Sequence, residues 1–351
     1  MIESSILEKI ALLSPGTKLR KALEDIIAAN LGALLFFVDD VNKYRNIMQG
    51  GFELNCSFTP ERLYELAKMD GAIILSEDVT KIFSANVHLV PDPNIPTTET
   101  GIRHRTAERV AKQTGKMVVA ISKRRNVISL YVGDYKYVLN DRRLLMTKST
   151  QALNALEKYR TSFEKIFSTI ENEELRGISI YDVARAIEKA LIMLRIWEDI
   201  YPYIVELGED GKLISLQMSE LLEGLDDIVF LLVMDYSFDE LKMEDAKRLI
   251  SKMKEERDLS TLRIVKYLGW DVQSVAQAME LVYLPRGYRI LKYFAKLPIT
   301  VSAKVVERYK NLKALLTATI QELMSIEGVG EKRAHAILDV VEILKSKIKQ
   351  L

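Results

Sequence analysis

A cluster of basic side chains surrounds the start of a predicted helix in ETGIRHRTAERVAKQTG, residues 99–115. Arg103, His104 and Arg105 are consecutive, and Arg109 follows Arg105 by about one helical turn. The first N–H groups of a helix lack partners and the helix dipole is positive at this end, so an anion is favoured there. The pattern therefore indicates a site for a polyanion such as a triphosphate. A solvent-exposed basic helix face would contain the same residues, and both interpretations stay open at this point.

Two other stretches place charged side chains beside predicted buried strands. Asp70 and Gly71 directly precede AIILS, where a carboxylate can hold a metal ion and a glycine lets a flat ring or a ribose approach its backbone. Ser122 ends KMVVAIS, and the basic residues 123–125 follow it. One carboxylate and two basic clusters, without a Walker-type glycine loop, suggest a nucleotidyl-transfer site of unusual type. Taken singly, ordinary surface turns explain each stretch as well.

The elements that must position these residues form an α/β segment over residues 1–140. The strand signals ALLFFV, AIILS, NVHLV and KMVVAIS alternate with helix signals. Thr59 and Pro60 begin one predicted helix, and a hairpin turns at Gly133 and Asp134. In the basic helix, residues at i, i+3, i+4 and i+7 spacing face a core, namely Ala107, Val110, Ala111 and Thr114, and Gly115 ends the helix.

The charge distribution predicts two further domains. Residues 141–282 have a formal net charge of −8 and long stretches of 3.6-residue periodicity, so we expect them to be helical. Residues 283–351 carry 13 Lys and Arg against 6 Asp and Glu, a net charge of +7. A small basic domain at the end of an otherwise acidic chain suggests contact with nucleic acid.

A stretch in this basic segment, LMSIEGVGEKRAHAIL, predicts how that contact is made. Gly328 and Gly330 allow a tight turn that points N–H groups outward at a helix N-terminus, where a phosphate can be held. Lys332 and Arg333 add positive charge. The pattern resembles the helix-hairpin-helix motif, whose backbone contacts give affinity rather than sequence specificity. A plain glycine turn between two helices is the alternative.

A weaker copy of this motif precedes it in LPITVSAKVVERY. With an offset of 28 residues, Val301 aligns with Val329, but both glycines are lost. We therefore expect this copy to be a structural partner of the hairpin, although its Lys304 and Arg308 could still reach a phosphate.

Composition excludes several classes of site. Cys56 is the only cysteine, so an internal disulfide and a cysteine-clustered metal site are excluded, and we expect it to be a small buried hydrophobic residue. The sequence contains no run of about 18 apolar residues and no basic-then-apolar leader, which predicts a cytoplasmic protein.

Four stretches in combination, DGAIILSED, ANVHLVPDP, TETGIRHRTAERVAKQTG and ISKRRNVISLY, resemble the DNA integrity scanning (DisA) family of diadenylate cyclases. The resemblance covers the whole chain and implies a multidomain α/β plus all-α protein. Its domains would be an N-terminal diadenylate cyclase domain at 1–140 with a central mixed sheet flanked by helices, a helical linker domain at 141–282 and a helix-hairpin-helix DNA-binding domain at 283–351. The implied reaction condenses two ATP into cyclic di-AMP and two pyrophosphates with Mg²⁺ or Mn²⁺. The implied partners are branched or damaged DNA, bound without sequence preference, and further copies of the chain in an octamer whose catalytic domains face each other.

The resemblance also implies roles for single residues. Asp70 would coordinate the metal ion and help activate the ribose 3′-hydroxyl, and Gly71 and Leu89 would line the adenine pocket. The implied catalytic residues are Asp70, Arg103, His104 and Arg105. The implied nucleotide-binding residues are Gly71, Ala72, Leu89, Gly101, Arg103, Thr106, Ser122, Lys123 and Arg125. The implied DNA-binding residues are Gly328, Gly330, Lys332 and Arg333.

The chain departs from the family pattern G-T-R-H-R at Ile102, where a threonine hydroxyl is replaced by an aliphatic group. Loss of one hydrogen bond costs about 0.5–1.5 kcal/mol if it is neutral and about 1.5–3 kcal/mol if it is charge-assisted, so we expect lower turnover rather than none. The alternative function is a structure-specific DNA-binding protein whose N-terminal domain only binds or senses a nucleotide. Asp70 favours chemistry, and Ile102 favours the alternative.

Overall fold

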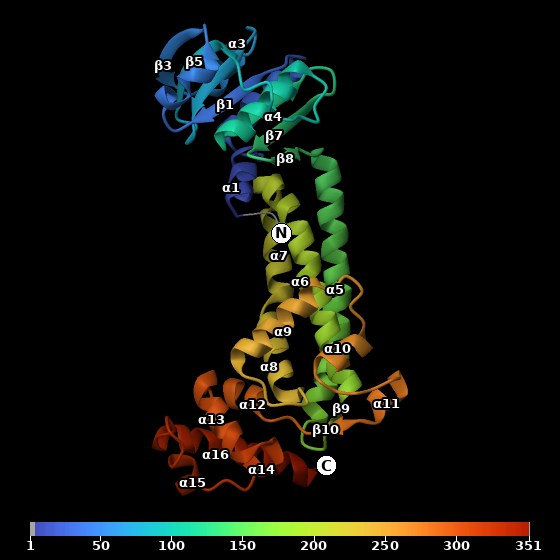
Figure 1. Ribbon diagram of the computed structural model, residues 1–351. Coiled ribbons are helices and arrows are strands. Elements are labelled where there is room, and N and C mark those ends of the chain that lie inside the picture. Colours follow the sequence, from blue (N-terminus) through green and yellow to red (C-terminus); the bar gives the residue numbers. More distant parts are fainter. Residues whose placement is uncertain (1–3, 351) are drawn as a thin grey trace. The chain divides into compact units, whose positions relative to one another are not determined.

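The computed structural model describes residues 4–350, with side chains described up to residue 346. Two compact units make up the chain, one of Met1–Gln151 with Glu198–Gln217 and the other of Ala152–Trp197 with Met218–Leu351 (Figure 1). Helices α5 (Arg142–Glu173) and α6 (Ile180–Leu207) contribute residues to both units. The predicted domain boundaries at 140 and 282 stay predictions, and their outer ends at residues 1 and 351 lie outside the described part.

The first unit is built on a mixed sheet of eight strands. Their order is β2-β5-β4-β1-β6-β7-β8, with β3 also paired to β5. Only the β1–β4 pairing is parallel. The strands are β1 Leu34–Val38, β2 Met48–Gln49, β3 Phe52–Ser57, β4 Ala72–Ser76, β5 Lys81–Leu89, β6 Met117–Ser122, β7 Val127–Val132 and β8 Tyr135–Val138.

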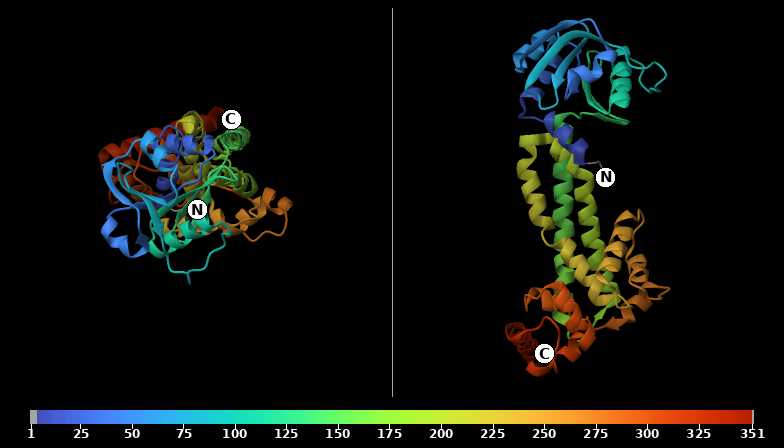
Figure 2. Two further views of the ribbon diagram at one scale, coloured as in Figure 1. Left: turned by 90° about the horizontal axis from the view of Figure 1, so that it is seen from above. Right: turned by 60° about the vertical axis from the view of Figure 1, so that its left-hand side comes forward.

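Helices cover both faces of this sheet, because alternate residues of its buried strands point to opposite sides. On one face, Leu35 and Phe37 of β1 pack with buried side chains of α1 (Ser4–Leu12), α2 (Lys18–Ala28) and α3 (Pro60–Leu66). On the other face, Leu34 and Phe36 pack with Ala107, Val110 and Ala111 of α4 (Ile102–Thr114). The right-hand view of Figure 2 shows α4, in teal, lying along one side of the sheet.

The expected helix signals act at the expected residues. The Thr59 hydroxyl accepts a hydrogen bond from the N–H of Arg62, with Pro60 at the first helical position of α3. Gly115 ends α4 in the left-handed conformation, with φ of 68°. β7 and β8 form the predicted hairpin around Gly133. The predicted α/β architecture is therefore confirmed for the first unit.

The remainder of the chain is helical, as predicted, except for the two-residue strands β9 (Ile178–Ser179) and β10 (Val282–Tyr283), which pair with each other. A 3-10 turn, η2 (Gly208–Gly211), follows α6. The helices after it are α7 Lys212–Leu222, α8 Leu225–Tyr236, α9 Met243–Glu255, α10 Thr261–Tyr267, α11 Val275–Glu280, α12 Tyr288–Tyr293, α13 Ile299–Tyr309, α14 Leu312–Leu315, α15 Ile320–Met324 and α16 Glu331–Gln350.

Three features of the first unit differ from the sequence-based predictions. Helix α1, the 3-10 helix η1 (Val41–Ile47) and strands β2 and β3 were not predicted, and β5 begins at Lys81 rather than Asn86. Cys56 is half-buried rather than buried, because β3 pairs along one side only, with β5.

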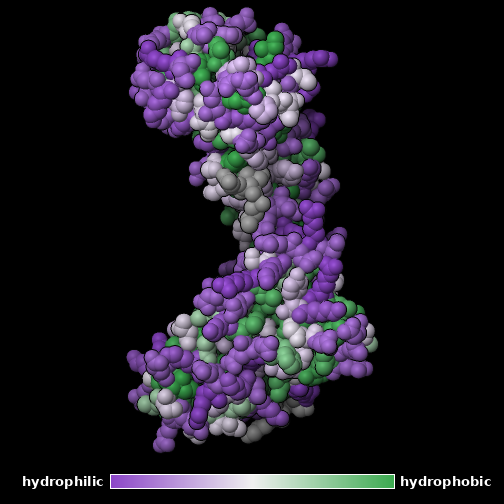
Figure 3. Space-filling view, viewed as in Figure 1, coloured by the Kyte–Doolittle hydropathy of each residue, from purple (hydrophilic) through white to green (hydrophobic). Residues whose placement is uncertain are grey.

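Among residues 4–350, no helix is long and apolar enough to span a membrane. In the view of Figure 3, hydrophobic residues form small separate areas within a mostly hydrophilic surface.

Candidate active site

The register of the sheet brings the predicted nucleotide-binding stretches to one edge. β1 and β4 are parallel with Leu34 opposite Ala72, so both strands begin at this edge. β6 runs antiparallel to β1 with Ala120 opposite Leu34, so β6 ends there. Asp70 therefore precedes β4 at the same edge at which Ser122 ends β6. Asp70 is exposed and Ser122 is half-buried.

The end of β5 lies at this edge too, since Val87 pairs with Ala72. Leu89 ends β5 and is buried. Gly71 adopts a φ of 91°, and a β-carbon there would lie 2.8 Å from the carbonyl carbon of Asn86. Glycine at 71 is thus required by the chain's own strand β5. Its role and that of Leu89 beside an adenine ring stay predictions.

Arg103 reaches the same edge from helix α4. Its guanidinium Nη1 occupies the space that a β-carbon at Gly32 would fill, and the main-chain oxygen of Ile121 lies 3.1 Å from that position. Gly32 lies two residues before the start of β1, and the N–H of Ile121 donates to the O of the intervening Ala33. Arg103 therefore packs against the main chain where β1 begins and β6 ends.

The N-terminus of α4 is open at its first residues. Gly101 is the N-cap residue, and no side chain caps the helix there. A β-carbon at Gly101 would meet only His104 Nδ1, at 3.9 Å, so the fold itself does not require glycine. The side chain of Ile102 is 83% exposed. Free N–H groups at this end are available to an anion.

A cavity of about 350 Å³ opens beside this helix end. It brings together four of the predicted residues, Gly101, His104, Ser122 and Arg125. Its other lining residues are Glu99, Thr100, Arg124, Val127, Ser129, Lys136 and Val138. The remaining predicted residues are outside its lining, namely Asp70, Gly71, Ala72, Leu89, Arg103, Arg105, Thr106 and Lys123.

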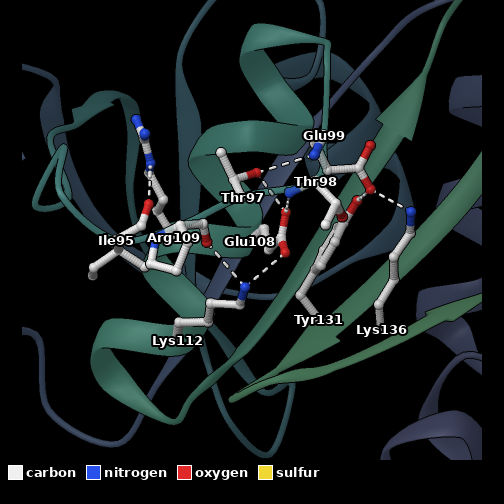
Figure 4. A network of polar contacts seen from close by, with 10 residues as sticks. Ile95, Thr97, Thr98, Glu99, Glu108, Arg109, Lys112, Tyr131 and Lys136 are labelled. Atoms are coloured by element: carbon white, nitrogen blue, oxygen red, sulfur yellow. Dashed lines mark hydrogen bonds and ion pairs between the residues drawn. The ribbon is translucent and has the colours of Figure 1, made fainter.

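A segment that we call the strap, residues 91–101, is bound to α4 by side chains of the helix (Figure 4). Glu108 is buried, accepts hydrogen bonds from the Thr97 hydroxyl and the N–H of Thr98, and pairs with Lys112 at 2.8 Å. Burial opposes its charge, but the hydrogen bonds from Lys112 and Thr97 hold the pKa of Glu108 below its usual value.

The sequence placed Arg109 in the basic cluster at the start of α4, but in the structure its side chain is bound to the strap. Its Nε donates to the strap carbonyl of Ile95 at 2.9 Å, and Lys112 Nζ donates to that of Pro96 at 3.0 Å. Both side chains donate to strap carbonyls, and Lys112 also pairs with Glu108, so their role is structural. Arg105 also contacts the strap, since its Nη2 donates to Thr100 O at 3.3 Å. Arg103 and Arg105 are the arginines nearest the helix start, where we expect a ligand.

Sequence reasoning missed a group of three residues, of which Glu99 and Lys136 line the cavity and Tyr131 is buried behind it. The Tyr131 hydroxyl donates to Glu99 Oε1 at 2.7 Å, and Lys136 forms an ion pair with the same carboxylate. Burial opposes ionisation, but Lys136 and Tyr131 hold the pKa of Glu99 below its usual value. The only sequence signal was alternation along β8, which places Lys136 and Val138 on one face.

The surroundings of His104 favour its neutral form. Burial lowers its pKa, and the nearby charges of Arg103, Lys136 and Arg125 lower it further, against the opposing effect of Glu99. Its ring lies edge-on to that of Tyr131, with centroids 6.5 Å apart. A neutral imidazole can donate one hydrogen bond and accept another, which suits positioning rather than charge neutralisation.

The predicted DNA-binding hairpin joins α15 to α16. Gly328 has a φ of 88°, which favours glycine, and Gly330 has no atom within 4 Å of the place where a β-carbon would lie. Arg333 Nη1 donates to Gly328 O at 2.6 Å and so stabilises the turn. Lys332 is exposed. Open space beside Gly330 at a helix N-terminus is where a phosphate could approach.

The weaker copy is a structural partner of this hairpin, but its register differs from the prediction. Val301 Cγ2 lies 3.3 Å from the β-carbon position of Gly328. The turn between α12 and α13 has Lys296 at a φ of 53°, where the turn before α16 has Gly328. The offset is 328 − 296 = 32 residues rather than 28. Pro298 then corresponds to Gly330, and it has no N–H to offer a phosphate.

Comparisons with known proteins match three consecutive parts of the chain. Residues 20–135 match the family described as DisA bacterial checkpoint controller nucleotide-binding, residues 139–277 its linker region, and residues 311–340 the helix-hairpin-helix motif. The DNA integrity scanning protein DisA of Thermotoga petrophila is 53% identical over 99% of both chains. The protein of that name from Carboxydothermus hydrogenoformans is 43% identical, also over 99% of both. A solved structure of DacA from Staphylococcus aureus covers 40% of this chain and 93% of its own, with 22% identity and a TM-score of 0.31, values too low to support an argument about function.

Proposed function

The chain belongs to the family of the DNA integrity scanning protein DisA, and on that premise we propose that it condenses two ATP into cyclic di-AMP and two pyrophosphates across two facing active sites. It is a diadenylate cyclase that also carries a DNA-binding motif. The observation that best supports the proposed site is the shared sheet edge, along which Asp70, Arg103 and Ser122 lie although they come from three separate stretches of sequence.

In the proposed reaction, each ribose 3′-oxygen attacks the α-phosphorus of the opposite ATP. One P–O bond forms, the bond from that phosphorus to the bridging oxygen breaks, and pyrophosphate leaves with the electron pair while the hydroxyl proton passes to solvent. Negative charge grows on the departing pyrophosphate, so fixed cations and N–H donors lower the barrier.

The chain's own residues would supply those cations and donors. Arg103, Arg105 and Thr106 would hold phosphates at the open end of α4, while Gly101 lets them approach the first N–H groups. Lys123 and Arg125 would neutralise charge on the α-phosphate and the leaving pyrophosphate, and Ser122 would donate a hydrogen bond to them. His104 would help to position these phosphates. Gly71, Ala72 and Leu89 would line the adenine pocket.

Asp70 would hold the Mg²⁺ or Mn²⁺ that we propose as cofactor. Within residues 4–350 there is no group of three or more His, Cys, Asp or Glu side chains placed to hold a metal ion. A lone exposed carboxylate fits Mg²⁺ nevertheless, because this ion is usually bound by one or two carboxylates together with substrate phosphates and water. When bound, the ion would make the 3′-hydroxyl easier to deprotonate.

Two chains must cooperate because each carries one Asp70-Gly71-Ala72 and one Arg103-His104-Arg105 stretch. One catalytic domain therefore holds one ATP, whereas the product is a two-fold symmetric ring. A two-fold interface between identical chains provides the matching arrangement. We extend this to an octamer of two tetramers that meet through their catalytic domains, as the family resemblance implies.

DNA binding is proposed for the hairpin of Gly328, Gly330, Lys332 and Arg333. Backbone and lysine contacts to phosphates read no bases, so branched or damaged DNA would be bound by shape and charge. Because ATP and chromosomal DNA are the proposed ligands, we also propose a cytoplasmic location and a role in the response to DNA damage.

Incubation of the purified full-length protein with ATP and Mg²⁺ or Mn²⁺ tests the proposal. Chromatography should find cyclic di-AMP and pyrophosphate in a ratio of one to two. Bound but unconverted ATP under every metal condition would overturn it, and would favour a DNA-binding protein that only senses a nucleotide.

A further inference from the structure

An ion pair between Lys136 and Glu99 lies in the wall of the cavity beside helix α4. Lys136 comes from β8, and Glu99 comes from the end of the strap, two residues before the N-cap Gly101. Both residues line the cavity together with His104 and Ser122. The side chain of Glu99 is only 11% exposed, whereas that of Lys136 is 41% exposed. The lysine is therefore the partner that a ligand can reach.

The Glu99 carboxylate is fixed from two sides. The hydroxyl of the buried Tyr131, on β7, donates to it at 2.7 Å. The strap is itself anchored by Glu108, which binds Thr97 and Thr98 just before Glu99. Figure 4 shows Tyr131 and Lys136 converging on Glu99. A carboxylate held this firmly limits the positions that the lysine ammonium group can take.

The strand that carries Lys136 is held on its other face as well. Glu206 is 1% exposed and accepts hydrogen bonds from the Tyr137 hydroxyl at 2.6 Å and from the N–H and side-chain amide of Asn140 at 2.6 and 2.9 Å. Neighbouring residues of a strand point to opposite faces, so Tyr137 faces Glu206 while Lys136 faces the cavity. The contacts with Glu206 therefore hold β8 on the face opposite the cavity.

The charges in the cavity wall suit a polyphosphate. Arg124, Arg125 and Lys136 are cationic, and Glu99 is the single carboxylate among the lining residues. An ammonium group has three donors, so the pairing with Glu99 leaves donors free for a second oxygen ligand.

We propose that Lys136 is a further phosphate-binding residue of the nucleotide site and that Glu99 is its positioning residue. The inference rests on the proposed function, because it takes the triphosphate of ATP as the ligand. The ammonium group would keep its ion pair with Glu99 and use a free N–H to bind a phosphate oxygen.

Binding of 3′-deoxy-ATP tests the proposal, since this analogue lacks the attacking hydroxyl and is not converted. Titration calorimetry with the full-length protein and Mg²⁺ would compare it with 3′-deoxyadenosine, which lacks phosphates. Lys136→Met should weaken 3′-deoxy-ATP binding roughly ten- to a hundredfold, the value of a charged hydrogen bond, and change 3′-deoxyadenosine binding less than about twofold. Lys136→Arg keeps the charge and should retain most of the affinity, and Lys136→Gln serves if the methionine variant does not fold.

Lys81→Met is the matched control, because Lys81 is an exposed lysine of the same sheet at the opposite edge, and it should bind like the native protein. Glu99→Gln tests whether Glu99 positions Lys136 or only repels the phosphates of the ligand. If Glu99 only repels phosphate, its loss tightens binding of 3′-deoxy-ATP; if it positions Lys136, its loss weakens binding. Tighter binding would overturn the role of Glu99.

The outcomes also separate this inference from the proposed function. Failure of the native protein to bind 3′-deoxy-ATP would contradict the proposed nucleotide site itself. Native binding that Lys136→Met leaves unchanged would contradict only the role of Lys136.

Discussion

The guanidinium of Arg103 lies against the main chain of Gly32, in the space that a β-carbon at residue 32 would occupy. This contact fixes one arginine of the basic cluster at the edge where β1 begins and β6 ends. Gly32 thus supports the candidate site, although it is far from Arg103 in the sequence and belongs to none of the motifs described above.

Gly32→Ala should weaken nucleotide binding without unfolding the first unit. The new methyl group displaces the flexible end of Arg103, and the loss of one charge-assisted contact should weaken 3′-deoxy-ATP binding roughly tenfold. Calorimetry measures the affinity and thermal unfolding checks the fold. Gly330→Ala is the control, because that position is open and belongs to the other unit. Native affinity in Gly32→Ala would show that the Arg103 contact is dispensable.

Ile102→Thr should raise the rate of cyclic di-AMP formation. The side chain is 83% exposed, so replacing it removes little buried apolar surface and should leave the thermal midpoint unchanged. A hydroxyl at the open end of α4 can bond a phosphate, worth about 0.5–1.5 kcal/mol, or up to roughly tenfold in rate. Steady-state kinetics with ATP measure it, with Ile343→Thr on α16 as an exposed control. An unchanged or lower rate would contradict a phosphate contact at this residue.

The strap should contribute acid-sensitive stability through Glu108. Its pKa is lowered on folding, so its stabilisation is fully present above the unfolded value of 4.5 and is lost as the pH falls through the lower folded value. Glu108→Gln should therefore destabilise the first unit by about 1–3 kcal/mol at pH 7, and the difference from the native protein should shrink below pH 4.5. Thermal unfolding at a series of pH values measures this. A difference that is constant from pH 7 to pH 3 would rule out this linkage.

The sequence predicted the elements with strong local patterns and the stretches that they carry. Helix α4 was predicted with its stop at Gly115 and with three of its four core residues, Ala107, Val110 and Ala111, whereas Thr114 is only half-buried. The 3.6-residue periodicity and a left-handed glycine are local signals. β3 was missed because it lies at the side of the sheet, is mostly exposed and has an irregular register between Glu53 and Cys56. Its sequence, FELNCS, does alternate apolar and polar residues, but the run is short and its apolar residues are exposed or only half-buried.

Local sequence patterns could not predict the contacts between stretches that are distant in the sequence. Arg109 and Arg105 look equivalent in sequence, and the sequence did not indicate that each donates to a strap carbonyl, Arg109 to Ile95 O at 2.9 Å and Arg105 to Thr100 O at 3.3 Å. The pairing of Glu99 with Lys136 likewise depends on how β8 returns beside β7. Which charges remain free for a ligand is decided by tertiary packing, and the sequence alone could not assign it.

Gly330→Ala should weaken DNA binding while leaving the fold intact. A β-carbon there meets no protein atom within 4 Å, but it would occupy space that a phosphate needs at the start of α16. Gly328→Ala, in contrast, should also lower stability, because its φ is 88° and Val301 lies close.

Lys332→Gln should lower the slope of log affinity against log salt by about 0.9 on duplex DNA. Filter binding at several salt concentrations measures this slope and the DNA affinity of the glycine variants. Native DNA affinity in Gly330→Ala would remove the hairpin from the proposed interface.

Asp70→Asn tests the activating carboxylate. The amide is nearly isosteric, so fold and binding of 3′-deoxy-ATP should persist, but it is a poor ligand for a hard cation and synthesis of cyclic di-AMP should fall at least about a hundredfold. Substantial product from this variant alone would remove Asp70 from its proposed role.

Mixed assemblies of native and Asp70→Asn chains test the facing-site reaction most directly. In a facing pair with one native and one variant chain, the first phosphodiester bond can form, but ring closure needs the second activated hydroxyl. Chromatography of products formed from ATP should therefore show a linear dinucleotide with a 5′-triphosphate accumulating relative to cyclic di-AMP as the variant fraction rises. Cyclic di-AMP alone, in proportion to the native chains, would mean that each chain completes both bonds by itself, in contradiction to two facing sites.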